Sequence, residues 1–542
     1  MMGTDLVVLL LLLLVLALAR RCRGARVTLR RSALPPGPAP LPVLGNLLQL
    51  QPRRLDQALM EVEPNSGFVE LPACWGPVFT VRLGPRPAVV LCVYAALRDA
   101  LVLQADTFSG RGAMDVFELF TRGNGIVFFN RPRWQTLRNL ALGALKEFGL
   151  GTLTIEKHVL EEAACLLSEF QATIGAAQPG KLRGLVRLLD NAVSNVICSV
   201  VFGNRYGYGD PEFLRLLDLF HDNFRIMSSR WGESLHREIE ADRPCQGPTE
   251  ILSPQMYNIF PSLLDWFPGP HHRILRNFAE LRVFISEKIQ SHRQTRQLRE
   301  PRDFIDCFLD QMDKERQDAE SHFREETLVM TTHDLFFGGT KTTSTTLRYG
   351  LLILLKFPQV AGLRDTEALD DGLGLRDGWG SEHTRLTASA SPSEGTGGAG
   401  CRGRSDELPP HPALTPSLEN RACLPYTNAV LREIQRFISV LPLGLPRALT
   451  RDAHFCTVPK GTFVIPLLVS AHRDPTQFKD PDRFNPTNFL DDKSEFRSNE
   501  AFLPFAPVLP APCGKPANID LTPQYTGLGN VPPGFLLYLV AR

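Results

Sequence analysis

The sequence has no pair of cysteines in a C-x-x-C arrangement, although it contains 11 cysteines in all. An odd, scattered set of this kind argues against a structural zinc site and against the disulfide framework of a small secreted domain. The sequence also has no basic excess, since 59 Lys and Arg residues balance 58 Asp and Glu residues. Nucleic-acid binders usually carry a basic patch or stripe, so we expect no nucleic acid among the partners.

Long apolar runs are nearly absent as well, because only Leu6 to Ala19 is apolar enough to enter a bilayer. This excludes a transporter with several membrane spans. What remains is a chain of 542 residues, of which 43% are hydrophobic and 22% are charged. That balance is typical of a globular protein with ample material for a core, and it excludes global disorder and a fibrous repeat.

The single apolar run favours an uncleaved membrane anchor. As a helix it is about 21 Å long, and the arginines that follow it extend its reach toward the headgroups. The alternative is a cleaved signal peptide, because Ala17 to Ala19 has the small-x-small form of a cleavage site. The leader holds Asp5 and no Lys or Arg, so positive charge lies only after the run. We therefore expect residues 1–31 to be a signal anchor with the body in the cytosol.

A proline-rich segment, 32–53, follows the anchor and predicts a stiff, extended hinge. The rest of the chain, 54–542, is expected to form the main domain. Apolar spacing in it predicts helices over 145–170, 185–202, 212–226, 273–292 and 325–357. Short runs predict strands over 78–83, 88–92 and 462–468. We predict a mainly α fold with small β-sheets.

The predicted helix 325–357 contains two adjacent glycines, Gly338 and Gly339, in its interior. Each costs about 1 kcal/mol relative to alanine, so the pair needs an explanation. One explanation is the close approach of a flat ligand, with the hydroxyls of Thr342 and Thr343 loosening the helix. The other is tight packing of two helices.

Further motifs follow in a fixed order. Glu433 and Arg436 are spaced three apart, which alone is common on helix surfaces, and Pro-Asp-Arg-Phe follows at 481–484. Trp134 and Arg138 lie upstream of the glycine pair. In this order, and behind an anchor and a proline-rich hinge, the chain resembles the cytochrome P-450 family, specifically its microsomal mammalian family 2 enzymes. Three longer stretches carry the same resemblance: 191–203, 257–271 and 331–347.

The resemblance implies a triangular helical prism, with haem held between the Gly/Thr helix and a proximal cysteine loop. It implies a haem-thiolate monooxygenase that oxidises small apolar substrates, xenobiotic or lipid-like, with O2. Electrons would come from an NADPH-dependent reductase. It also implies that the protein lies in the endoplasmic reticulum membrane, with membrane lipid as a further partner.

The family's roles transfer to the matching positions of this sequence. Thr342 would deliver protons, with Gly339 and Lys341 beside it in the catalytic segment. The family often has an acid where this chain has Lys341, so an acid–alcohol pair is absent here. The resemblance implies haem contacts by Trp134, Arg138, Arg447 and Gly338. It implies a buried charge network of Glu433, Arg436 and Arg483. It places the substrate pocket at Asp334, Phe337, Val440, Leu443 and Leu528.

The resemblance fails at the haem-ligand loop. The family pattern Phe-x-x-Gly-x-Arg-x-Cys-x-Gly begins at Phe502 to Phe505 and would place Cys at 512, but the chain has Pro512 and then Cys513. Cys513 is therefore a metal-ligand candidate off the expected spacing. A stretch resembling the family's later strand region begins at Asn518, which leaves no room for the helix that follows the ligand. We infer that the loop and this helix are missing between 506 and 517.

Three other segments depart from the family pattern as insertions, namely 64–75, 234–256 and 365–420. The last is rich in Gly, Ser, Pro and charged residues and has the composition of a disordered loop. Two functions therefore remain open. One is a haem-thiolate monooxygenase with impaired activity, and the other is a catalytically inactive, membrane-anchored pseudo-enzyme without haem.

Overall fold

The computed structural model describes a body of helices with a small sheet, and it describes the chain in fourteen stretches. These are residues 34–47, 49–50, 59–62, 69–112, 114–127, 132–147, 153–175, 184–228, 269–297, 300–318, 320–357, 360, 424–453 and 458–504. The expected anchor, the inserts 234–256 and 365–420, Cys513 and Leu528 therefore lie outside the described residues.

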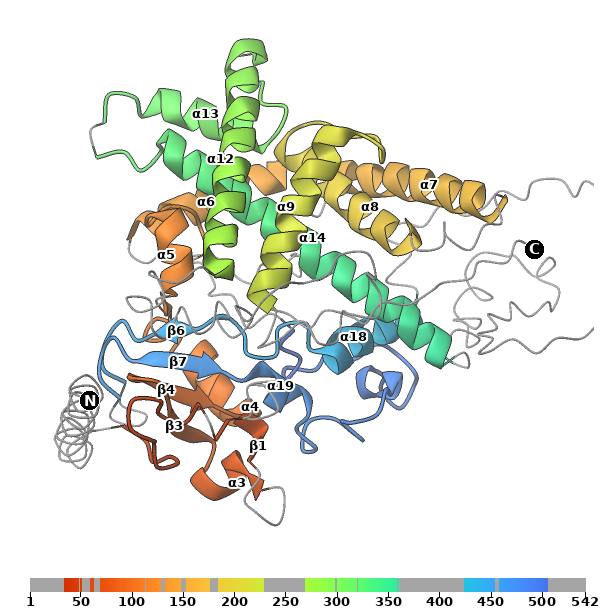
Figure 1. Cartoon of the computed structure of the whole chain (residues 1–542). Coiled ribbons are helices and arrows are strands. Elements are labelled where there is room, and N and C mark those ends of the chain that lie inside the picture. Colours follow the sequence, from red (N-terminus) through yellow and green to blue (C-terminus); the bar gives the residue numbers. More distant parts are fainter. Residues whose placement is uncertain are drawn as a thin grey trace, which may run out of the picture.

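Helices make up most of the described chain, which confirms the predicted fold class. The short ones are α3 (Leu71–Trp75), α4 (Val93–Arg98), η1 (Asp99–Leu103), α5 (Asp115–Thr121), α19 (Leu468–His472) and η5 (Pro486–Phe489). The longer ones are α6 (Pro132–Glu147), α7 (Leu153–Gly175), α8 (Gly184–Val201), α9 (Pro211–Ser228), α12 (Pro270–Thr295), α13 (Phe304–Lys314), α14 (Glu325–Lys356) and α18 (Pro425–Ile438). In Figure 1 the long helix α14 runs through the molecule, with α7, α8, α9 and α12 on one side and the sheet on the other.

The main sheet has five short strands in the order β3-β4-β7-β6-β5. Their bounds are β3 (Val78–Leu83), β4 (Arg86–Leu91), β5 (Gly110–Arg111), β6 (Arg447–Ala448) and β7 (Phe463–Pro466). Only β4 and β7 run parallel; the other pairs are antiparallel. A separate hairpin pairs β1 (Glu61–Val62) with β2 (Val69–Glu70). The described part of the expected insert 64–75 thus forms β2 and α3.

The largest hydrophobic cluster fills the space between α14 and the helices beside it. Phe336, Phe220 and Phe213 are among its fully buried side chains. A second cluster covers one face of the sheet and a third covers the other, because side chains alternate along strands such as β4. This arrangement brings the amino-terminal strands together with segments from the last hundred residues of the chain.

Periodicity located α7, α8, α9, α12 and α14, but the predicted ranges did not include α13, α18 or most of α6, and one boundary was wrong. The pattern over 145–170 predicts one helix, whereas α6 ends at Glu147 and α7 begins at Leu153. Both helices carry leucines at helical spacing, so an apolar pattern continued across the connection between them. The predicted strands at 78–83, 88–92 and 462–468 correspond to β3, β4 and β7.

Within the described residues, no helix combines the length and the hydropathy that a membrane span requires. The apolar run from Leu6 to Ala19 precedes the first described residue, so the expected anchor stays a prediction.

Candidate functional site

Glu433 and Arg436 form a buried ion pair on α18. Both are at most 1% exposed, and the Nε and Nη2 atoms of Arg436 each lie 2.7 Å from a carboxylate oxygen of Glu433. The spacing of three residues puts both side chains on the same face of the helix. A bidentate pair of this kind tolerates burial because each charge meets its counter-ion at good geometry.

The rest of the Arg436 guanidinium binds backbone carbonyls at the last residue of α19 and in the segment after it. It donates hydrogen bonds to the carbonyl oxygens of His472, Pro481 and Arg483. Arg483 thus contributes its carbonyl, while its side chain is exposed. The expected network of three buried charges is therefore corrected to two, because the Arg483 guanidinium remains in solvent.

His472 extends this network toward the loop expected to bind haem. Its Nε2 atom accepts the backbone N–H of Leu503 at 3.0 Å, so its Nδ1 atom carries the proton. That proton is donated to Oγ of Ser439, at the carboxyl end of α18, over 2.8 Å. Burial and the nearby charge of Arg436 lower the pKa of His472 to about 3. The neutral ring therefore joins α18 to the last described turn before residue 505.

On α14, Thr342 is buried and its hydroxyl donates to the carbonyl of Gly338 at 2.7 Å. Gly339 faces α8, since a β-carbon at this position would lie 2.6 Å from Cδ1 of Ile197. Close helix packing thus explains Gly339, whereas Thr342 satisfies its proton donor within its own helix. The acid that precedes this threonine in many family members is replaced by Lys341.

Lys341 is turned toward α8, where its Nζ atom lies 3.2 Å from Oδ2 of Asp190. The same oxygen lies 3.0 Å from Nε2 of His221 on α9. Asp190 is 5% exposed and Lys341 is 9% exposed, so the ion pair is almost completely removed from water. Three helices therefore meet at one carboxylate beside the Thr342 segment.

Asp334 holds the segment between α5 and α6 against α14. Its Oδ2 atom accepts the backbone N–H groups of Ile126 at 2.8 Å and Val127 at 3.0 Å. The backbone at Gly125 has a positive φ of 90°, and a β-carbon there would lie 2.4 Å from the same oxygen. Glycine is thus required at 125 both for conformation and for space. The carboxylate expected to line a substrate pocket fixes this backbone loop, and its place in a pocket stays a prediction.

Trp134 and Arg111 bind carbonyls of the same loop. The indole N–H of Trp134 donates to Ile126 over 2.7 Å, and Nε of Arg111 donates to Val127 over 2.9 Å. Trp134 therefore positions the loop, and its indole N–H is already engaged. The guanidinium of Arg138 lies 5.7 Å from the Trp134 ring centroid, a cation–π contact that orients this cation. Burial lowers the pKa of Arg138.

Arg447 stands directly opposite Arg111 in the β5–β6 pair. Burial lowers the pKa of Arg447 to about 10, and burial followed by the charge of Arg447 lowers the pKa of Arg111. The Nε atom of Arg447 has no hydrogen-bond partner among the residues that the structure describes. Like charges facing each other across strands are destabilising unless an anion lies between them. The pair is therefore suited to a carboxylate.

The candidate pocket residues do not gather in one hydrophobic cluster. Phe337 belongs to the cluster beside α14, where its ring lies 6.0 Å from Phe224 and 5.9 Å from His333. Val440 packs in a cluster formed by α14 and α18, and Leu443 packs against the sheet. Phe337, Val440 and Leu443 therefore belong to three separate clusters.

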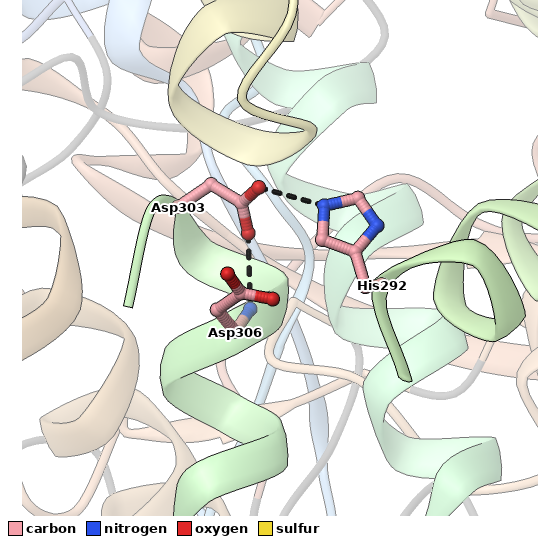
Figure 2. A group of neighbouring side chains, drawn as sticks. All are labelled: His292, Asp303 and Asp306. Atoms are coloured by element: carbon pink, nitrogen blue, oxygen red, sulfur yellow. Dashed lines mark hydrogen bonds and ion pairs between the residues drawn. The ribbon is translucent and has the colours of Figure 1, made fainter. Parts of the chain in front are cut away.

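A separate group, His292, Asp303 and Asp306, has the composition of a metal site (Figure 2). Nε2 of His292 lies 2.7 Å from Asp303, and Nδ1 lies 2.7 Å from the carbonyl of Lys288. Both neighbours accept hydrogen bonds, so both ring nitrogens act as donors and the ring is held as imidazolium. A metal needs a free lone pair on the ring, so this group is a buried ion pair. Asp303 also caps α13 by accepting the N–H of Asp306.

The fold and the site together define a helical protein with cations arranged for an anionic cofactor. The sequence profile of the family described as Cytochrome P450 matches residues 35–250, 247–362 and 406–506. Cytochrome P450 2F2 of Mus musculus is 40% identical over 94% of this chain and 95% of its own length. Cytochrome P450 2F1 of Homo sapiens is 39% identical over 99% and 98%, and cytochrome P450 2B4 of Oryctolagus cuniculus is 38% identical over 94% and 94%.

The chain therefore belongs to the cytochrome P450 family, as the resemblance to its family 2 enzymes predicted. Haem-thiolate monooxygenation is the function of this family, and haem is its cofactor. The match to the family profile omits 363–405 and ends at 506.

The described residues on the propionate side fit haem. Haem carries two carboxylates, and Arg447 offers a guanidinium beside the second cation, Arg111, with an Nε atom that no described residue binds. Arg138 offers a third, held over the Trp134 ring. The residues that would ligate iron fall after Pro504 and lie outside the described residues.

Sequence reasoning missed Arg111, Asp190 and His472. Arg111 carries a signal, since it stands between Gly110 and Gly112 in a short polar stretch. A β-carbon at Gly110 would lie 2.4 Å from the carbonyl of Ala448, so this glycine permits the strand pairing that places Arg111. Asp190 and His472 meet their partners across 151 and 31 residues, and no local pattern predicts such contacts.

Proposed function

We propose that this chain is a haem-thiolate monooxygenase by descent that takes up little haem, because its ligand loop is lost. The observation that carries the cofactor side is the Arg447 guanidinium, which stands opposite Arg111 and whose Nε atom has no hydrogen-bond partner in the described part of the chain. The observation that carries the impairment is the sequence from 506 to 517, which has Pro512 in place of the expected cysteine. The end of the family match at 506 supports the same view.

In this proposal the chain's own residues bind the cofactor and hold a proton near it. Arg447, Arg138 and Arg111 would bind the propionates, and the Glu433–Arg436 pair would hold the chain path beneath the cofactor. Thr342 would hold a proton at its hydroxyl, next to Gly338 on α14. When bound and ligated by thiolate, haem supplies the activation of O2 that no side chain can provide. By family, electrons come from an NADPH-dependent reductase, and the substrates are small molecules.

The second function is a membrane-anchored pseudo-enzyme without haem. It is favoured by the same sequence at the ligand loop, where three prolines, Pro507, Pro510 and Pro512, remove backbone N–H groups. Thiolate ligation depends on such donors around the sulfur. Cys513 is the cysteine nearest to the expected position.

Haem titration of the purified full chain separates the two functions. We expect substoichiometric haem and no thiolate-type Soret band in the reduced carbon monoxide complex. Stoichiometric haem with that band would overturn the proposal of impairment. In that case Cys513→Ser should abolish the band if Cys513 is the ligand, and Cys307→Ser, at a described site on α13, serves as the control.

We further propose that residues 1–31 anchor the protein in the endoplasmic reticulum membrane with its body in the cytosol. The support is the apolar run followed by arginines. Deletion of Met1 to Arg31 should move the protein to the soluble fraction or leave it peripherally bound. Protection of the body from protease added to intact microsomes would contradict this orientation.

A further inference from the structure

Asp190 on α8 accepts hydrogen bonds or ion pairs from two other helices at a single oxygen atom. Nζ of Lys341 on α14 and Nε2 of His221 on α9 lie 3.2 Å and 3.0 Å from its Oδ2 atom. We propose that Asp190 is a positioning residue for the Thr342 segment, because it holds the Lys341 cation against α8. The contact rests on geometry alone, whereas its relevance to proton delivery rests on the function proposed for Thr342.

The position of Lys341 makes a partner on α8 necessary. Lys341 immediately precedes Thr342, and Gly339 shows that α14 approaches α8 closely at this level, against Ile197. An ammonium group buried there has little access to water, and an unpaired buried charge is very costly. Without Asp190 the Lys341 side chain would have to turn away from α8 or lose its proton, because burial already lowers its pKa, and either change would alter the contact between α14 and α8.

The surrounding charges single out Asp190. Arg348 on α14 and His221 on α9 also lie near the pair, and Arg187 of α8 acts on His221. Burial, followed by the charge of Lys341, lowers the pKa of His221, so the ring is neutral while its Nε2 atom lies 3.0 Å from Asp190. Burial by itself would raise the pKa of Asp190, but the nearby His221 ring and the charge of Lys341 outweigh burial and lower it. The carboxylate therefore remains ionised and accepts a hydrogen bond from Lys341.

A cycle of variants tests this role in the full-length protein without requiring bound haem. Asp190→Asn preserves shape but removes the charge, so Lys341, whose pKa burial already lowers, loses its ion-pair partner. Amide hydrogen exchange in the segment 338–346 should then accelerate by about tenfold or more. Asp190→Glu keeps the carboxylate and should restore most of the protection. Adding Lys341→Met to Asp190→Asn should also restore protection, because no unpaired charge remains.

The matched control is Asp310→Asn on α13, which removes a carboxylate paired with Arg296 at 2.9 Å. It should leave exchange in 338–346 unchanged. Equal exchange rates in Asp190→Asn and Asp190→Glu would overturn the proposal. It would also be overturned if the effects of the Asp190 and Lys341 substitutions on exchange were additive, or if exchange accelerated evenly over the whole molecule. A parallel haemin titration tests the proposed function separately from the proposed role of Asp190. If wild type binds no haemin, the cofactor side of the proposed function fails, while the exchange cycle still decides the role of Asp190.

Discussion

The backbone N–H of Leu503 donates to Nε2 of His472, and this contact connects the last described turn of the chain with the residues that Arg436 binds. The His472 carbonyl accepts from Arg436, and its Nδ1 proton is donated to Ser439. One neutral ring therefore links the Glu433–Arg436 pair to the last described turn of the chain. Protonation of this ring would therefore affect both the Glu433–Arg436 pair and the last described turn.

The first prediction is that His472 makes the protein sensitive to acid. In the folded state the pKa of His472 is about 3, whereas in the unfolded chain it is about 6.5. As pH falls below 6.5 the unfolded state binds the proton first, so the free energy of unfolding decreases until about pH 3. His472→Gln should reduce this slope in urea unfolding measured from pH 7 to about pH 4. An unchanged slope would show that the folded ring is protonated readily.

The second prediction is that Arg436→Ala lowers the free energy of unfolding by about 3–5 kcal/mol, because Glu433 would remain as a buried unpaired charge. Chemical denaturation measures the change. Arg473→Ala provides the control, since its pair with Asp482 is 4.0 Å long and exposed. The control should change stability by less than about 1 kcal/mol. A similar effect from both variants would contradict the role assigned to burial.

The third prediction concerns Asp334. Asp334→Ala would leave the N–H groups of Ile126 and Val127 without their acceptor, at a cost of about 3 kcal/mol. Amide exchange should accelerate most in a peptide that covers 125–127. Asp334→Asn keeps one carbonyl acceptor and should have a smaller effect. No local change in exchange would mean that the carboxylate does not hold this loop.

The fourth prediction has the opposite sign with pH. Burial alone would lower the pKa of His292, but the hydrogen bond to Asp303 outweighs burial and raises it above 6.5. The stabilisation is therefore complete below pH 6.5 and is lost as pH rises through the raised value. The loss of stability in His292→Gln should be larger at about pH 5.5 than at about pH 9. Zn²⁺ should not stabilise the protein through this site, and a zinc-dependent rise in Tm absent from His292→Gln would contradict the assignment.

The fifth prediction concerns repair. Inserting a family ligand loop and its helix between Phe505 and Asn518, with 365–420 shortened to a helical connection, should restore haem binding. The reason is that the Arg111–Arg447 cation pair and the buried Glu433–Arg436 pair cost folding free energy, and their presence is consistent with a retained cofactor scaffold. The visible Soret spectrum measures the result. A repaired chain that folds but binds no haem would indicate that damage extends beyond the loop.

The family and the mainly helical class were predictable from the sequence because they depend on periodicity and on motif order. The Glu433–Arg436 pair was predictable too, since both residues are close in sequence on one helix. The roles of Arg483 and Asp334 were not, because residue type does not reveal whether a side chain or a backbone carbonyl makes the contact. Asp190 was missed because its partners lie on other helices, and tertiary packing alone brings them together.

Arg436 binds the end of α19 and the chain after it through three carbonyl oxygens, which every amino acid possesses. The arginine therefore constrains the path of this segment and leaves its side chains free to change. Variation at exposed positions such as Asp482 and Arg483 should be tolerated even though the segment borders the most deeply buried charge of α18. One guanidinium can thus maintain the backbone course of this segment whatever side chains its outer surface carries.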